Sequence, residues 1–153
     1  MAPNGRGLHR LFLSLHRLFR PERSSADLRE LIFEGDFLLR EGRLDPALKS
    51  YRKAARIDPG NVTAWKKSAM IYGMMGRYME AIASLDRATK IDPFDHQAWM
   101  HRGFLLWRLE MWQDALTSFE RAAALDSEDG YARYCRIVTA EEMMKRRRSR
   151  SRK

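Results

Sequence analysis

The sequence repeats itself with a fixed period. Pro59 and Trp65 return as Pro93 and Trp99, an offset of 34 residues in both cases. A unit of this length holds two amphipathic stretches of about 13 residues, and a helix pair that short cannot bury its own apolar stripe, so stacked copies must share a core. Extending the comparison in both directions gives three units in phase, at 28–61, 62–95 and 96–129.

The residues between the amphipathic stretches are those that begin and end helices. Asp45, Asn61 and Asp95 precede apolar periodic runs and are typical N-cap residues, while Gly42 and Gly76 fall in the turns. The sequence therefore predicts an all-α fold in which each unit is a helix-turn-helix.

Small and large residues recur in phase with the units. The first helix of each unit has a small residue at the position where its partner must approach closely, and the second helix has a bulky one. This pattern predicts that the two helices of a unit interlock. The small residues are Gly35, Ala69 and Gly103, and the bulky ones are Tyr51, Leu85 and Phe119.

At these positions the chain resembles the tetratricopeptide repeat family, over residues 28–129. The resemblance implies a right-handed superhelical solenoid that binds a peptide or helix of a protein partner in its concave face, built mainly from first helices. Ser127 stands where the family has proline, which marks the end of the array. The matching residues are Gly35, Leu38, Ala47, Tyr51, Ala54 and Pro59; Trp65, Ala69, Tyr72, Ala81, Leu85, Ala88 and Pro93; Trp99, Gly103, Leu106, Ala115, Phe119 and Ala122.

The stretch GYARYCRIVTAEEMM at 130–144 continues in phase as a first helix without a partner. The end of a solenoid needs a polar outer surface. We therefore predict a capping helix with Arg133, Arg136, Glu141 and Glu142 on its outer face.

The net charge of +9 is concentrated at the two ends. Residues 1–21 hold four arginines and no acid, and residues 145–153 hold seven Lys or Arg, so residues 22–144 carry −2. We predict a basic amphipathic helix with a linker at 1–27 and a basic disordered tail at 145–153. The tail is expected either to keep the end soluble or to bind polyanions, nucleic acid or anionic lipid, through Lys145, Arg146, Arg147, Arg148, Arg150, Arg152 and Lys153.

A shorter repeat lies near the N-terminus, where LHRLF at 8–12 returns at 15–19. An isolated helix of about 13 residues is marginal in water, so this helix needs an apolar surface. Three surfaces remain open: the solenoid in cis, near Phe33, Leu39 and Met74; a membrane interface; or a separate partner or targeting receptor. Its apolar stripe consists of Leu8, Leu11, Phe12, Leu15, Leu18 and Phe19.

The family's phase, carried along the first helices, gives the side chains expected in the concave face. The lining is apolar, and Met, Trp and Phe adapt to or anchor protein interfaces. Ile32 and Met70 could instead fill space between helices. The expected partner-binding groove contains Phe33, Asp36, Lys66, Lys67, Met70, Met74, Met100, His101, Phe104, Trp107, Arg108, Tyr131 and Tyr134, with Arg29, Ile32 and Leu39 beside them.

Some family members grip the C-terminal carboxylate of chaperones with a clamp of Lys, Asn and Arg. The matching positions here are Ile32, Asp36, Lys67, Gln97 and His101, of which only Lys67 fits. We do not expect this clamp.

No catalytic constellation is apparent. His96 and His101 are five residues apart, so they do not share a helix face as a zinc-binding pair at i, i+4 does. The acids at 92–95 and 128–130 fall where helices need N-caps. Cys135 is the only cysteine, which excludes an internal disulfide and points to a reducing compartment. We expect no enzyme activity, metal or cofactor.

These observations predict a protein-interaction scaffold or adaptor that binds a peptide or amphipathic helix of a partner in an apolar groove. It is expected in the cytoplasm, either free or at a membrane surface, and no segment is long enough to span a bilayer. The alternative is a peripheral membrane-associated or nucleic-acid-associated protein that acts through its basic ends.

Overall fold

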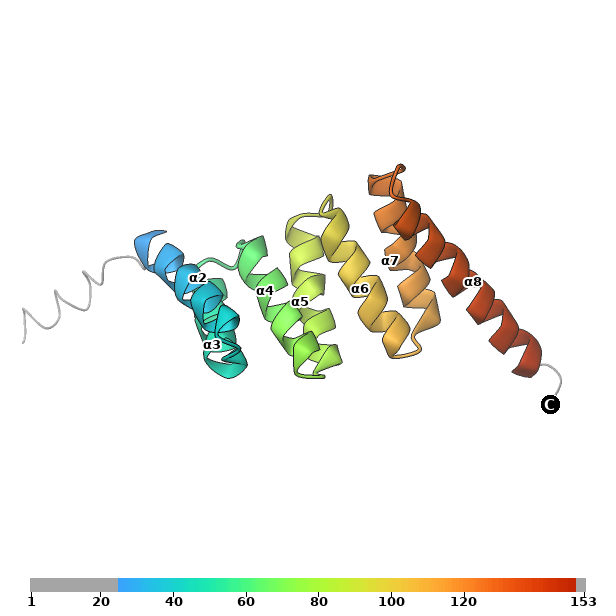
Figure 1. The fold of residues 1–153 in the computed structure, drawn as a ribbon. Helices are drawn as coiled ribbons and strands as arrows, with labels where there is room; N and C mark the ends of the chain where they lie inside the picture. Colours follow the sequence, from blue (N-terminus) through green and yellow to red (C-terminus); the bar gives the residue numbers. More distant parts are fainter. Residues whose placement is uncertain (1–24, 151–153) are drawn as a thin grey trace, which may run out of the picture.

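The fold is an all-α solenoid, as the sequence predicts. The computed structural model describes residues 25–150, in which every regular element is a helix, and consecutive helices lie side by side along the array (Figure 1). The N-terminal segment at 8–19 and the last residues of the basic tail lie outside this range. None of the described helices combines the length and hydropathy needed to cross a bilayer. The helices are α2 (Ser25–Arg40), α3 (Leu44–Ile57), α4 (Val62–Met74), α5 (Tyr78–Ile91), α6 (His96–Arg108), α7 (Trp112–Leu125) and α8 (Gly130–Arg150).

The backbone keeps the period of the sequence. α3, α5 and α7 begin at residues 44, 78 and 112, and α4 and α6 begin at 62 and 96. The side chains of Asn61 and Asp95 each accept a hydrogen bond from the backbone N–H three residues later, at 2.9 Å. These two predicted N-caps are confirmed. α2 begins at Ser25, so the end of the predicted linker is already helical.

The predicted N-cap at Asp45 is wrong, because α3 begins at Leu44 and its N-cap position is Arg43. Gly42 adopts a left-handed φ of 71°, which lets the chain reverse tightly. The N–H of Arg43 then donates to the carbonyl of Leu38 at 2.9 Å. Asp45 consequently lies in the first turn, where a carboxylate favours the positive end of the helix dipole.

The same left-handed position recurs in all three turns between paired helices. It holds glycine in the first two, Gly42 and Gly76, but a glutamate, Glu110 with φ of 59°, in the third. An L residue costs about 1–2 kcal/mol in this conformation. The Glu110 carboxylate accepts a hydrogen bond from Nη1 of Arg146 at 2.7 Å, so the strained turn is tied to α8.

α8 is longer than predicted. Residues 145–150, predicted to be disordered, continue the helix. Nε of Arg146 donates to Glu142 at 3.1 Å, its Nη1 donates to Glu110, and its guanidinium lies 4.7 Å from the ring centroid of Trp112. Glu142, expected on the outer face, is half-buried in this cluster. The contacts fasten the last turns of α8 against the α6–α7 turn.

The outer face of α8 is less polar than predicted. Arg133, Arg136 and Glu141 are exposed as expected, but so are the apolar side chains of Ile137 and Met144. The end of the array is therefore partly apolar.

Close approach of paired helices depends on glycine at two places. A Cβ on Gly35 would lie 2.8 Å from the ring of Tyr51, and one on Gly103 would lie 2.5 Å from the ring of Phe119. Both rings are buried. The predicted packing of small against large residues is present at these two contacts.

We expect Gly103→Ala to lower the free energy of unfolding by about 1–3 kcal/mol, because the added methyl group would overlap the buried Phe119 ring. Gly73→Ala is the matched control: its Cβ would meet Leu105 at an ordinary 3.8 Å. That change should be neutral or stabilising by up to about 1 kcal/mol. Urea denaturation measures both variants, and equal stability of the two would contradict the packing described.

Candidate functional site

Two apolar pockets lie next to each other on the side of the solenoid formed by α4, α6 and α8. The pocket between α4 and α6 has a volume of about 250 Å³ and the pocket between α6 and α8 about 290 Å³; Phe104 lines both. We call the pair the apolar groove. The first is lined by Lys66, Ala69, Met70, Gly73, Leu85, His101, Phe104 and Leu105, and the second by Phe104, Trp107, Phe119, Tyr131, Tyr134, Cys135, Val138 and Thr139.

Phe104, at the centre of the groove, is held by neighbouring rings. Its centroid lies 5.2 Å from that of Phe119 in an edge-to-face arrangement and 5.8 Å from that of Tyr131. Because Phe119 packs directly on the backbone of Gly103, the core fixes the position of the Phe104 ring. Trp107, beside it, is partly exposed and packs edge-to-face on Trp112 at 5.7 Å.

The groove follows the period of the sequence. Met70, Phe104 and Val138 occupy the same position in successive units and line the pockets. Val138 was not among the predicted groove residues, although applying the period to Phe104 would have identified it. Cys135 and Thr139 were also missed, because they are buried and carry no signal that separates a pocket wall from the core.

Some of the predicted groove residues line a pocket and others do not. Met100, which was predicted in the groove, is instead a core residue: it is only 5% exposed and packs in the core cluster that includes Ala132. Phe33 and Met74 are exposed but line neither pocket. Arg108 stacks on the ring of Tyr78 in α5, with its Cζ 5.0 Å from the centroid. The predicted residues that line a pocket are Lys66, Met70, His101, Phe104, Trp107, Tyr131 and Tyr134.

Asp36 and Lys67, both predicted in the groove, form an ion pair between α2 and α4. Nζ of Lys67 lies 2.9 Å from Oδ1 of Asp36, and the hydroxyl of Tyr51 donates to the same oxygen at 2.6 Å. Desolvation raises the pKa of Asp36, but the hydrogen bonds from Tyr51 and Lys67 outweigh it and lower that pKa overall. Burial and the same hydrogen bond raise the pKa of Tyr51, so the phenol remains a donor.

The second groove lysine is also paired. Nζ of Lys66 donates to Oδ2 of Asp95 at 2.6 Å, while Oδ1 of Asp95 caps α6. Desolvation and the nearby Lys66 ammonium lower the pKa of His101, so its imidazole is neutral at pH 7. The α4–α6 pocket therefore has an apolar floor and a rim whose lysine charge is balanced.

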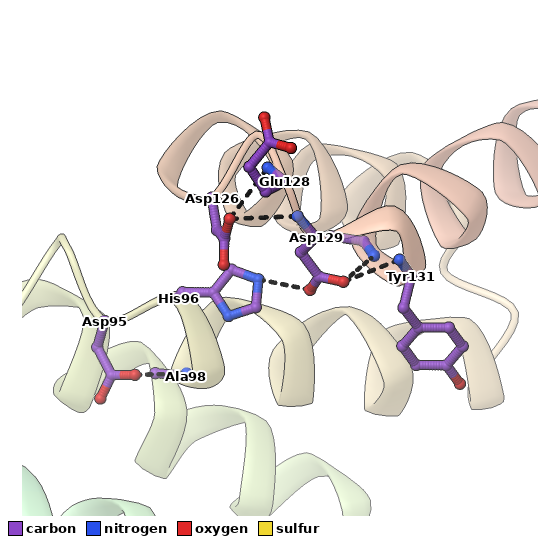
Figure 2. Close-up of polar contacts among 8 residues, drawn as sticks. Asp95, His96, Ala98, Asp126, Glu128, Asp129 and Tyr131 are labelled. Carbon is purple, nitrogen blue, oxygen red and sulfur yellow. Dashed lines mark hydrogen bonds and ion pairs between the residues drawn. The ribbon is translucent and has the colours of Figure 1, made fainter.

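A similar contact joins α6 to α8, as Figure 2 shows. Oδ1 of Asp129 accepts hydrogen bonds from the N–H groups of Tyr131 and Ala132 at 2.8 and 3.2 Å and so caps α8. Oδ2 lies 2.9 Å from Nε2 of His96, an ion contact without hydrogen-bond geometry. Desolvation raises the pKa of Asp129, but its backbone hydrogen bonds and His96 lower it overall. This contact joins the start of α8 to the start of α6.

The groove holds no apparent catalytic apparatus. Burial raises the pKa of the Cys135 thiol, as does the Asp129 carboxylate, so the thiol stays protonated and serves as a wall of the pocket. Among residues 25–150, no three His, Cys, Asp or Glu side chains are placed to hold a metal ion. What the groove can do is bury apolar side chains of another molecule.

The folded part also has a basic surface that charge counting did not reveal. A pocket of about 360 Å³ on α3 is lined mainly by cations, with Asp45 and Leu48 beside them. The division of charge along the sequence suggested that positive charge is concentrated at the two ends. The α3 pocket shows that the folded part also gathers positive charge. The cations are Lys49, Arg52, Lys53 and Arg56 of α3 and Arg77 of the turn before α5.

Comparison with known protein families finds a match over part of the array. Residues 38–102 match the family model described as tetratricopeptide repeat. No curated protein sequence matches the chain.

Several solved structures share the fold. The first tetratricopeptide domain of Spaghetti (RPAP3), bound to an HSP90 peptide, has a TM-score of 0.73 at 20% identity, covering 79% of this chain and 96% of that chain. MamA protein has a TM-score of 0.74 at 25% identity, with coverage of 78% and 66%. The TPR2B domain of yeast Sti1, in complex with an Hsp70 peptide, has a TM-score of 0.69 at 18% identity, with coverage of 77% and 99%.

We expect Tyr51→Phe to raise the pKa of Asp36, because the variant lacks the hydroxyl that donates to the carboxylate. A folded-state pKa below the unfolded value of about 3.9 stabilises the fold above that pH, and the stabilisation disappears as the pH falls through the folded pKa. The variant should therefore lose less stability on acidification.

Carboxyl ¹³C NMR titration measures this pKa directly. Tyr72→Phe is the control, because the Tyr72 hydroxyl makes no hydrogen bond to Asp36. An Asp36 titration that is the same in Tyr51→Phe as in the wild type would contradict the assigned network.

Proposed function

Because the chain forms a solenoid of tetratricopeptide repeats, we propose that it is a protein-interaction module that holds a helix or extended peptide of a partner in the apolar groove. The observation that carries the proposal is the meeting of two apolar pockets at Phe104. The peptide-bound domains of Spaghetti and Sti1 support it, because they use the same fold to bind peptides.

The chemistry of the groove favours an apolar partner segment. Aromatic and methionine side chains dominate its exposed surface, and such residues anchor or adapt to interfaces. Partner residues that fill the two pockets would be large and apolar and would sit on either side of Phe104. An amphipathic helix with apolar residues one turn apart fits this requirement.

An acidic C-terminal tail fits the groove less well. The HSP90 peptide bound by Spaghetti is SRMEEVD, which contains three acids. Here Lys66 is held by Asp95 and Lys67 by Asp36, so binding such a tail would require breaking a pair. Of the clamp positions, Gln97 and His101 are neutral. We propose that this chain does not bind acidic chaperone tails.

The test is selection of helical peptides from a displayed library on the full chain. We expect Trp107→Ala and Tyr134→Ala each to weaken binding of the selected peptides by about tenfold or more, because both side chains are exposed anchors of the groove. Isothermal titration measures the affinities, and circular dichroism checks the fold.

Phe94→Ala is the matched control, since Phe94 is an exposed aromatic residue that lines neither groove pocket. The SRMEEVD peptide is the second probe and should bind far more weakly than the selected peptides. If the control weakens binding as much as the groove variants do, or if SRMEEVD binds best, the apolar groove is not the binding site.

A second candidate function is polyanion binding at the end of α8. The continuation of the helix to Arg150 favours it, because α8 carries the exposed cations Lys145 and Arg147 in its last turns. Arg146 is set apart from them by its contacts with Glu110 and Glu142. Duplex DNA and anionic vesicles are the two sources of phosphate to compare.

We expect the triple variant Lys145→Gln, Arg147→Gln, Arg148→Gln to flatten the salt dependence of DNA binding, since each phosphate contact contributes a slope of about −0.9 in log affinity against log salt. Arg146 is kept so that α8 stays anchored. Lys49→Gln, Arg52→Gln, Lys53→Gln is the matched variant on α3. If only the α3 variant weakens DNA binding, polyanions bind at α3 and not at the end of α8. If neither variant weakens DNA binding, this candidate function is wrong.

A further inference from the structure

The first helix of the array exposes a face that later first helices bury. Phe37 of α2 occupies the same position as Leu105 of α6, which is half-buried, and as Ile71 of α4 and Thr139 of α8, which are 0% and 1% exposed. Those two residues are covered because α3 packs on α4 and α7 packs on α8. Phe37 is 51% exposed, since α2 is the first helix of the described chain (Figure 1).

The exposed face of α2 combines aromatic rings with acids. Phe33, one turn before Phe37, is 69% exposed. Glu30 and Glu34 are exposed on the same side of the helix as Phe37, and Glu41 is exposed in the turn that follows the helix. Glu34 also accepts a hydrogen bond from the hydroxyl of Ser50 at 2.8 Å. The exposed face of α2 is thus apolar at its centre and negative around it.

The same positions in the next unit are apolar or small. Glu30 and Glu34 stand where α4 has Ala64 and Ser68, both buried against α3. Glutamates at such positions would be costly under an uncharged helix, because a buried carboxylate needs a partner. They suit a covering helix that brings positive charge.

The segment that precedes α2 has those properties. Residues 8–19 carry an apolar stripe at helical spacing, and residues 1–21 contain arginines but no acid. We propose that residues 8–19 form a helix that packs antiparallel to α2, over Phe33 and Phe37, and closes the first end of the solenoid. It supplies in cis the covering helix that each later first helix receives from the preceding unit.

The length of chain available fits this arrangement. Residues 20–24 separate the segment from Ser25, and five residues span at most about 17 Å, more than the 8–10 Å between packed helix axes. Loops of this length commonly join antiparallel helices. An antiparallel hairpin sets Leu11 opposite Phe33 and directs the apolar stripe at the exposed face of α2.

This position leaves the apolar groove free. The pockets lie between α4 and α6 and between α6 and α8, whereas Phe33 and Phe37 belong to α2 and line neither. The segment therefore does not compete with a groove ligand, in contrast to a helix docked near Met74. The inference stands independently of the function proposed for the groove.

The test is hydrogen exchange on the full chain, with Leu11→Ser, Phe12→Ser, Leu18→Ser and Phe19→Ser combined in one variant. We expect exchange across residues 28–41 to become faster by about tenfold or more, because α2 loses its cover, with little change in α6 and α8. Leu13→Ser is the matched control, since Leu13 lies off the apolar stripe and its loss should leave α2 protected.

Wild-type residues 8–19 that exchange like free peptide would overturn the proposal. So would protection that requires anionic vesicles, which would assign the segment to a membrane, or protection that rises with protein concentration, which would assign it to a second copy.

Discussion

The array depends on aromatic rings that pack against glycine positions of the paired helix. Tyr51 on Gly35 and Phe119 on Gly103 bring paired helices closer than any other residue would allow. This spacing helps to fix the positions of the first helices, and the apolar groove lies between these helices. Phe104 rests edge-on against Phe119, so the centre of the groove inherits its position from the contact at Gly103. The core packing and the apolar groove therefore depend on the same contacts.

Acidic side chains then fix one unit to the next. Asp95 caps α6 and pairs with Lys66 of α4, and Asp129 caps α8 and contacts His96 of α6. One carboxylate thus begins a helix and holds it to an earlier first helix. Since Lys66 is engaged in this way and Lys67 is paired with Asp36, the lysine charge beside the groove is already balanced. The polar contacts between units leave apolar burial as the main interaction open to a ligand.

Much of the fold was accessible from the sequence because its signals are local and periodic. Asn61 and Asp95 cap helices by accepting hydrogen bonds from backbone groups three residues later. Such local N-cap signals can be recognised in the sequence. Glu110 was not foreseen at a left-handed turn, because the reason for it is Arg146, which is 36 residues later and lies on another helix. The end of α8 was missed for the same reason, since a run of cations reads as disordered unless its partners are known.

The site was less accessible, because side chains of one type have different surroundings. Met70 lines a pocket while Met100 is buried in a core cluster, although both lie on first helices. Asp36 and Lys67 each looked available for a ligand until their pairing across the units was seen. The position of a residue in the repeat predicts which face of the helix it occupies. Whether that face is exposed depends on its contacts with neighbouring helices.

The exposed Ile137 on α8 determines how such a chain can grow. It occupies, one period later, the position that glycine holds at 35 and 103, where the paired helix comes within contact distance of the backbone. A helix that packed on α8 as α7 packs on α6 would meet a branched side chain there, so that close packing would require Ile137 to be replaced. Duplication of a module ahead of α8 meets no such obstacle. Length could therefore change by insertion within the array, while the terminal helix and its anchor at Glu110 are inherited unchanged.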